Sequence, residues 1–181
     1  MTILFSDLRD FTALSEQLSG AQVVTMLNVY HGRMVETIFA HGGTLDKYLG
    51  DGIMAYFGAP VPQPDHAERA VRCALTMQAA LATLNGERAR RGEPPLRMGI
   101  GIHSGTVVVG DVAARFEELT KLHEAAILVS EETRRRVGDA VAFSAAGSAP
   151  VRGKSEPLTM YIPLVPDDPE VRSVARAPWT S

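Results

Sequence analysis

Apolar residues follow two long helical patterns along this chain. They recur every three or four positions over 23–38, directly after a Ser-x-x-Gln stretch at 19–22 that has the form of a capping box. A second pattern of the same period covers 65–91 and ends just before a Pro-Pro pair. We therefore predict two long helices, the first of them closed by the glycines at 42–43.

Strand-like runs lie before, between and after the two predicted helices. A buried run opens the chain at 2–5, and 45–58 reads as two apolar runs folded about Gly-Asp-Gly. The run 96–103 alternates as a strand does. Further along, the pattern predicts an extended segment over 106–109, a helix over 112–122, a strand over 126–129, a helix over 130–137 capped by Ser130, and a strand over 141–143.

This order of elements predicts an α+β fold of the ferredoxin-like (split βαβ) type, a mostly antiparallel sheet with helices packed on one face. A chain of 181 residues with 45% hydrophobic content can form one domain with its own core, which we place at 1–162. Residues 163–181 are rich in proline and charge, and we expect a loosely held C-terminal tail there.

Charge and cysteine content narrow the class of partner. The net charge is −3, and the basic runs at 88–91 and 134–136 are interpreted as solvated helix faces, so we expect no nucleic-acid partner. The single cysteine, Cys73, is predicted to be buried beside Ala70 and Met77, which fits a reduced, cytoplasmic setting. No apolar run reaches bilayer length. Because the chain opens directly on a strand, we expect a domain of a longer polypeptide, with any anchor or sensor domain outside this segment.

Two carboxylates are the first candidates for chemistry. Asp7 ends the first predicted strand, and Asp51 occupies the tip of the predicted hairpin. In a split βαβ sheet the first strand lies beside that hairpin, so the two side chains can converge and hold Mg²⁺ or Mn²⁺, which prefer oxygen ligands. Taken alone, an aspartate between two glycines is also an ordinary turn residue.

The stretch that follows Asp7 adds a second feature. The strand turns at once into a helix near Phe11 and Thr12, and the first backbone N–H groups of a helix are a place for phosphate oxygens. A pair of metal ions beside such a turn is the arrangement used for in-line displacement at phosphorus.

Five segments, in this order, resemble those of the class III adenylate and guanylate cyclase catalytic domain: FSDLRDFTALSE, HGGTLDKYLGDGIMAYFGAPVPQPDHAERAVRCAL, RMGIGIHSGTVVVGD, AARFEELTK and VRGKSEPLTMY. The resemblance implies a homodimer with a nucleoside triphosphate site at each side of its interface. It also implies two Mg²⁺ or Mn²⁺ ions held by Asp7 and Asp51, with the Leu8 carbonyl as a further ligand.

The same resemblance assigns roles to basic residues. Lys47 matches the base-selecting lysine of adenylate cyclases, supplied by the other subunit, which favours ATP over GTP. Arg115 matches the arginine that stabilises charge on the reacting phosphate, and Lys154 matches the residue that holds the terminal phosphates, a role that Arg152 could also take. Read without the family, all of these are ordinary surface charges.

One stretch of the family pattern is missing between Asp111 and Val112. It would contain a strand, a second base-selecting residue and an asparagine one helical turn before Arg115. Either the printed sequence omits these residues or the protein lacks them. We favour omission, because a direct join would run a strand into a helix without a turn residue.

The leading hypothesis is an adenylate cyclase that makes 3′,5′-cyclic AMP and pyrophosphate from ATP. If the stretch after Asp111 is truly absent, a catalytically silent module that binds nucleotide and dimerises is the alternative. A guanylate cyclase is a third hypothesis, which Lys47 weakens.

Overall fold

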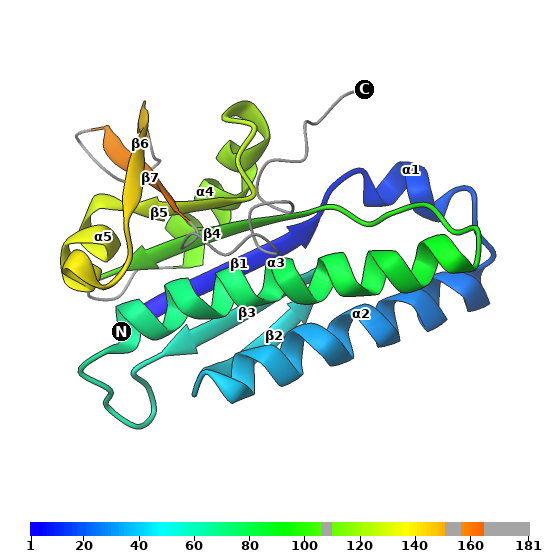
Figure 1. Ribbon diagram of the computed structural model, residues 1–181, viewed down its shortest axis with the longest axis horizontal. Coiled ribbons are helices and arrows are strands. Elements are labelled where there is room, and N and C mark those ends of the chain that lie inside the picture. The colour runs from blue at the N-terminus through cyan, green and yellow to red at the C-terminus, as the bar shows by residue number, and fades with distance from the viewer. Residues whose placement is uncertain (106–109, 151–156, 165–181) are drawn as a thin grey trace.

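The computed structural model describes residues 1–105, 110–150 and 157–164, and these form one seven-stranded sheet with helices against it (Figure 1). The strands are β1 (Thr2–Leu8), β2 (Thr44–Leu49), β3 (Gly52–Phe57), β4 (Met98–Ser104), β5 (Ile127–Ser130), β6 (Phe143–Ala149) and β7 (Leu158–Pro163). They lie in the order β2-β3-β1-β4-β5-β7-β6, and only the β4–β5 pair among them is parallel. The expected α+β fold with a mostly antiparallel sheet is confirmed.

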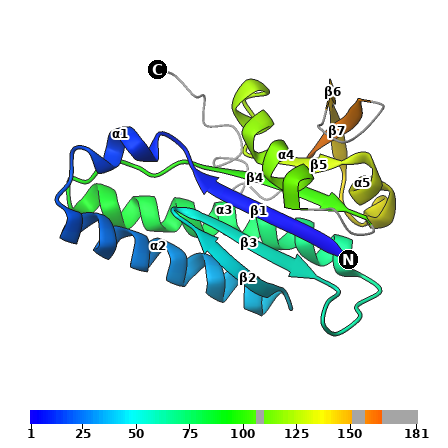
Figure 2. The ribbon, with the colours of Figure 1, turned by 180° about the vertical axis from the view of Figure 1, so that it is seen from behind.

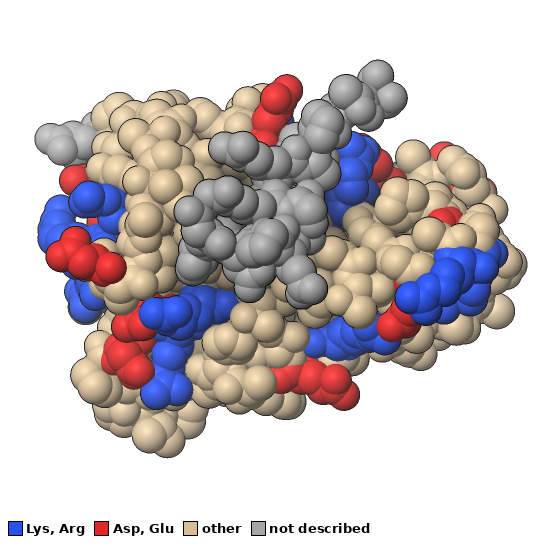
Figure 3. Space-filling model, in the orientation of Figure 1, with Lys and Arg blue, Asp and Glu red and all other residues tan. Residues whose placement is uncertain are grey.

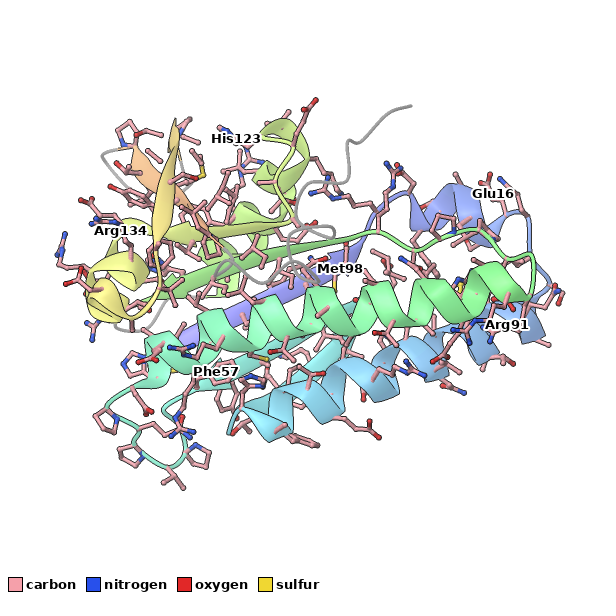
Figure 4. The ribbon with its side chains drawn as sticks, viewed as in Figure 1. Glu16, Phe57, Arg91, Met98, His123 and Arg134 are labelled. Carbon is pink, nitrogen blue, oxygen red and sulfur yellow. The ribbon has the colours of Figure 1, made fainter. Side chains whose placement is uncertain are left out.

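Two long helices, α2 (Gly20–Ala40) and α3 (His66–Arg90), cover one face of the sheet (Figure 1). The predicted capping box opens α2: Ser19 Oγ accepts from the Gln22 N–H at 3.4 Å, and Gln22 Oε1 accepts from the Ser19 N–H at 2.8 Å. The main core lies between these helices and the sheet, where Phe57 and Met98 are fully buried (Figure 4). Cys73 is buried in this core, as predicted.

Helix α4 (Gly110–Leu122) packs on the opposite face, which corrects the expectation that all helices share one face (Figure 2). Ala113 of α4 clusters with Ile3, whose neighbour Leu4 belongs to the core under α2 and α3. Strand β4 is buried along its whole length, so it carries a helix on each side. Glycines make room for this: a Cβ at Gly101 would lie 2.1 Å from the Ala113 carbonyl oxygen.

The described part of the chain has three further short helices: α1 (Phe11–Ser15), α5 (Glu131–Val137) and the 3₁₀ helix η1 (Gly138–Ala140). Ser130 caps α5 as predicted, with its Oγ accepting from the Thr133 N–H at 3.2 Å. Within the described residues, no helix combines the length and apolarity needed to cross a bilayer.

The end of the sheet differs from the prediction. The last predicted strand, 141–143, instead begins at Phe143 and continues to Ala149, where it pairs with β7. Small side chains in FSAAGSA give this strand a weak sequence signal, and partners in the sheet supply its stability. Pro163, assigned to the tail, pairs with Phe143 in the sheet. The predicted extended segment at 106–109, and the tail from 165 onward, lie outside the described residues.

The basic runs are mostly exposed, as interpreted. On the face in Figure 3, basic and acidic side chains are interspersed. Within the basic run at 134–136, Arg136 pairs with Glu132 at 2.8 Å. Arg88 is the exception, since only 5% of it is exposed. Its Nε donates to the Pro94 carbonyl at 2.9 Å and its guanidinium pairs with Glu93, so it fastens the end of α3 to the following turn.

Candidate active site

The structure brings Asp7 and Asp51 together at one end of β1 and β3. Ser6 pairs with Ile53 in the antiparallel register, which places the tip of the β2–β3 hairpin beside the end of β1. The Leu8 N–H donates to Asp51 Oδ2 at 3.1 Å, so the backbone that follows Asp7 fixes the Asp51 carboxylate. Gly52 permits this approach, since a Cβ there would lie 3.1 Å from Asp7 Oδ1.

The charged form of the Asp7 carboxylate is disfavoured in this position. Burial raises the pKa of Asp7 to about 7, helped by its hydrogen bond with Asp51 and by the negative charges of Asp51 and Glu117, while Lys121 acts in the opposite direction. Two such close carboxylates are a chemical fit for a divalent cation, whose charge would offset their repulsion. Among the described residues, no group of three or more acidic, histidine or cysteine side chains could hold a metal ion. A cation held here by the two aspartates would keep sites for water and phosphate.

Helix α2 supports the hairpin tip through His31, a residue that the sequence analysis did not select. His31 Nε2 lies 3.2 Å from the Asp51 carbonyl oxygen, and its ring stacks on Tyr48 of β2 at 4.7 Å between centroids. No local sequence pattern predicts this contact, because it joins residues 20 positions apart through the packing of α2 on the hairpin.

A third carboxylate, Glu117 of α4, approaches from the opposite helix layer. Only 2% of it is exposed, and its Oε1 lies against Gly99 of β4, where a Cβ would come within 2.6 Å. The sequence analysis missed Glu117. The signal that could have found it is the Gly99–Gly101 pair on one face of β4, which leaves space for a helix and its side chains.

The turn after β1 forms the expected short helix. Asp10 precedes α1 in the left-handed conformation, with φ of 56°, and its side chain makes no capping hydrogen bond. Phe11 packs against the main core, and Thr12 is exposed. A role for Phe11 and Thr12 in binding substrate stays a prediction.

Lys47 and Arg115 lie on the surface, each paired with an acidic neighbour in sequence. Lys47 Nζ lies 3.3 Å from Asp46, with 56% of the lysine side chain exposed. Arg115 pairs with Glu118 at 2.5 Å, with 46% of the arginine side chain exposed. Both basic groups are therefore open to a second molecule. Lys154 and Arg152 lie outside the described residues.

Helix α4 includes the point where the family pattern is interrupted. It runs through Asp111 and Val112 without a break, so the join that we expected the chain to avoid is accommodated within a helix. Because α4 already begins at Gly110, both residues of the join lie inside the helix and no strand runs directly into it there.

Comparisons with known proteins agree on one family. The sequence model of the family described as the adenylate and guanylate cyclase catalytic domain matches residues 1–163. Adenylate cyclase 1 of Rhizobium meliloti is 35% identical over 89% of the chain, and an adenylate cyclase of Anabaena cylindrica is 36% identical over 89%. The chain spans only 27% and 36% of these two relatives.

Solved structures agree in fold. The guanylyl cyclase Cya2 is 36% identical, with a TM-score of 0.78 and 90% of each chain covered. The adenylyl cyclase CyaB from P. aeruginosa is 30% identical, with a TM-score of 0.80, covering 91% of this chain and 93% of its own.

The match to the Rhizobium relative is longer than the part of this chain that it covers. It extends over 178 positions yet takes up only 89% of the 181 residues here. That relative therefore has residues inside the matched region for which this chain has no counterpart.

Proposed function

Because the chain belongs to the family of adenylate and guanylate cyclase catalytic domains, we propose that it converts ATP to 3′,5′-cyclic AMP and pyrophosphate. The observation that carries the proposal is the convergence of Asp7 and Asp51, tied together by the Leu8 N–H. It supports a metal-nucleotide site at this end of the sheet, whereas an aspartate that served only the hairpin turn would not need a second carboxylate beside it.

Asp7 and Asp51 would hold two Mg²⁺ or Mn²⁺ ions, with the Leu8 carbonyl as an additional ligand. When bound, such ions would lower the pKa of the ribose 3′-hydroxyl and offset the negative charge of the phosphates. The part of the chain itself is to keep both carboxylates in place. For Asp51, the Leu8 N–H of β1 holds the carboxylate and His31 of α2 contacts the backbone carbonyl.

The basic residues support a shared site. Lys47 and Arg115 are exposed and make ion pairs with near neighbours, so both can turn toward substrate held by a second copy. We propose a homodimer in which Lys47 selects adenine and Arg115 stabilises the reacting phosphate. The two adenylate cyclase relatives support ATP, whereas the likeness to Cya2 makes GTP the substrate to compare.

The test is the release of cyclic nucleotide and pyrophosphate from ATP and from GTP in the presence of Mn²⁺. We expect product from ATP in preference to GTP, and loss of product in Asp51→Asn. Asp139→Asn removes the same charge at an exposed position in η1 and should keep full activity. Unchanged turnover in Asp51→Asn would overturn the proposal.

A second candidate is a catalytically silent module that binds nucleotide and dimerises. The uninterrupted α4 at Asp111 and Val112 favours it, together with the extra residues of the Rhizobium relative. It predicts calorimetric binding of ATP with no cyclic product. Peptide mapping by mass spectrometry of the protein made from its own gene decides the premise. A tryptic peptide with the mass of residues 98–115 supports the direct join, whereas peptides with extra residues between Asp111 and Val112 restore a complete enzyme.

A further inference from the structure

Glu117 of α4 is a carboxylate buried between that helix and the sheet. It is 2% exposed, and within the described part of the chain its Oε1 is buried without a hydrogen-bond partner. An unsatisfied acceptor of this kind costs free energy that a donor would recover. The position therefore calls for a hydrogen-bond donor that the described residues do not supply.

The place of Glu117 in the sheet shows where that donor would lie. Its Oε1 packs against Gly99, and Gly99 is the register partner of Asp7 on the neighbouring strand. Side chains alternate between the faces of a strand, so Asp7 points to the same face as Ile3, which is the face that α4 covers. Glu117 and Asp7 thus share one side of the sheet, on adjacent strands.

Electrostatic coupling agrees with this placement. Glu117 contributes to the raised pKa of Asp7, and the pKa of Glu117 is itself raised, chiefly by burial and to a smaller extent by charges that include Asp51. Lys121, one turn further along α4, and Arg9, just after β1, both oppose the shift of Glu117. The guanidinium of Arg9 is held in place by a hydrogen bond from its Nη2 to the Ala125 carbonyl oxygen at 2.6 Å.

We propose that Glu117 is a positioning residue whose Oε1 accepts a hydrogen bond from a water molecule bound to the metal that Asp7 and Asp51 hold. The inference rests on the proposed metal site. Direct ligation is not the assignment, since the described residues contain no cluster of three metal-ligating side chains. Mg²⁺ and Mn²⁺ retain several waters, and acceptors for those waters tune the affinity of the metal.

The experiment measures Mn²⁺ affinity by electron paramagnetic resonance of the free ion, without nucleotide. We expect Glu117→Gln to weaken Mn²⁺ binding by about tenfold or more, the usual cost of losing an outer acceptor. Glu117→Asp keeps the charge but withdraws the carboxylate by one methylene, so it should weaken binding as well. Glu124→Gln removes an equal charge from an exposed position just after α4 and should bind Mn²⁺ as the parent does.

The outcomes separate the inference from its premise. If Asp51→Asn abolishes Mn²⁺ binding while Glu117→Gln binds within twofold of the parent, the metal site stands and the role of Glu117 is overturned. If Asp51→Asn still binds Mn²⁺ normally, the metal site itself fails. Melting of the metal-free variants is the structural readout: a loss of stability with Mn²⁺ affinity unchanged in both Glu117 variants assigns Glu117 to packing alone and overturns the proposal.

Discussion

The acidic and the basic parts of the candidate site are built in opposite ways. Asp7 and Asp51 are partly buried, joined through the Leu8 N–H, and backed by α2 on one side and α4 on the other. Lys47 and Arg115 stand on exposed surfaces, and within the described part of the chain their ion pairs are with near neighbours, Asp46 and Glu118. One chain thus brings its two carboxylates together, while the basic side chains of Lys47 and Arg115 remain exposed.

This difference fits the proposed division of the site between two copies of the chain. A pair of close carboxylates must be held in place by the fold, because folding has to overcome the repulsion between the two charges and the cost of desolvating them. A lysine or arginine that contacts substrate from a second subunit has to stay exposed until the subunits meet. The predictions below test that division, starting with the largest effect.

Arg115→Ala should lower turnover by about a thousandfold, the scale at which such an arginine acts in phosphoryl transfer. Mn²⁺ affinity should stay as in the parent, because the carboxylate pair is intact. Mixing Arg115→Ala with Asp51→Asn should restore part of the activity, since one of the two shared sites in a mixed dimer has both native residues. Arg135→Ala, on the exposed face of α5, is the matched control. A mixture as inactive as its components would show that both residues act within one chain.

Mn²⁺ affinity should fall by about tenfold per pH unit as the pH drops below 7, because a proton then competes with the metal for Asp7. The raised pKa of Asp7 also makes the free energy of unfolding depend on pH. The pKa of Asp7 is raised from its ordinary value of 3.8 to about 7, so the native state binds this proton more tightly than the unfolded state does. The free energy of unfolding without metal should therefore fall as the pH rises from about 4 to about 7.

Denaturant titrations at several pH values measure that slope. Asp7→Asn should flatten it over the same window, and Asp139→Asn should leave it unchanged. An identical slope in Asp7→Asn and the parent would assign the titration to other groups.

Lys47→Ala should reduce kcat/KM for ATP by about tenfold relative to GTP, the cost of one lost hydrogen bond to a charged group. Its exposed side chain plays no part in the core, so the melting temperature should not move. Initial rates with the two nucleotides give the ratio. An equal loss with ATP and GTP would mean that Lys47 contributes general charge and not base selection.

His31→Phe should have the smallest effect, a loss of a few-fold in Mn²⁺ affinity. The ring stack on Tyr48 can persist, while the contact with the Asp51 carbonyl is lost. Mn²⁺ titration of this variant beside His41→Phe, at the C-cap of α2, isolates the contribution of the hairpin contact. Equal affinities in the two variants would assign His31 to packing.

Much of the fold follows from local signals. The capping box of α2, the Gly-Asp-Gly hairpin and the Ser130 cap are each settled by residues a few positions apart, and all are present in the structure. The approach of Asp7 to Asp51 also follows from the sequence, because it needs only the neighbourhood of the first strand and the hairpin.

The remaining features depend on contacts between distant segments. Strand β6 exists through its pairing with β7, and the side of the sheet that α4 covers is not visible in a strand that is buried on both faces. Glu117 was missed for the same reason: its sequence context is that of a helical surface residue, and only the packing of α4 over Gly99 buries it.

Cys73 gives this molecule a practical property. Burial raises the pKa of its thiol to about 12, so at neutral pH it is a poor nucleophile toward maleimide or methanethiosulfonate reagents. A cysteine introduced at an exposed site such as Glu124 would then react selectively, with no need to remove the native one. Spin labels attached in this way could report the distance between two copies of the chain, and hence how they come together when nucleotide is added.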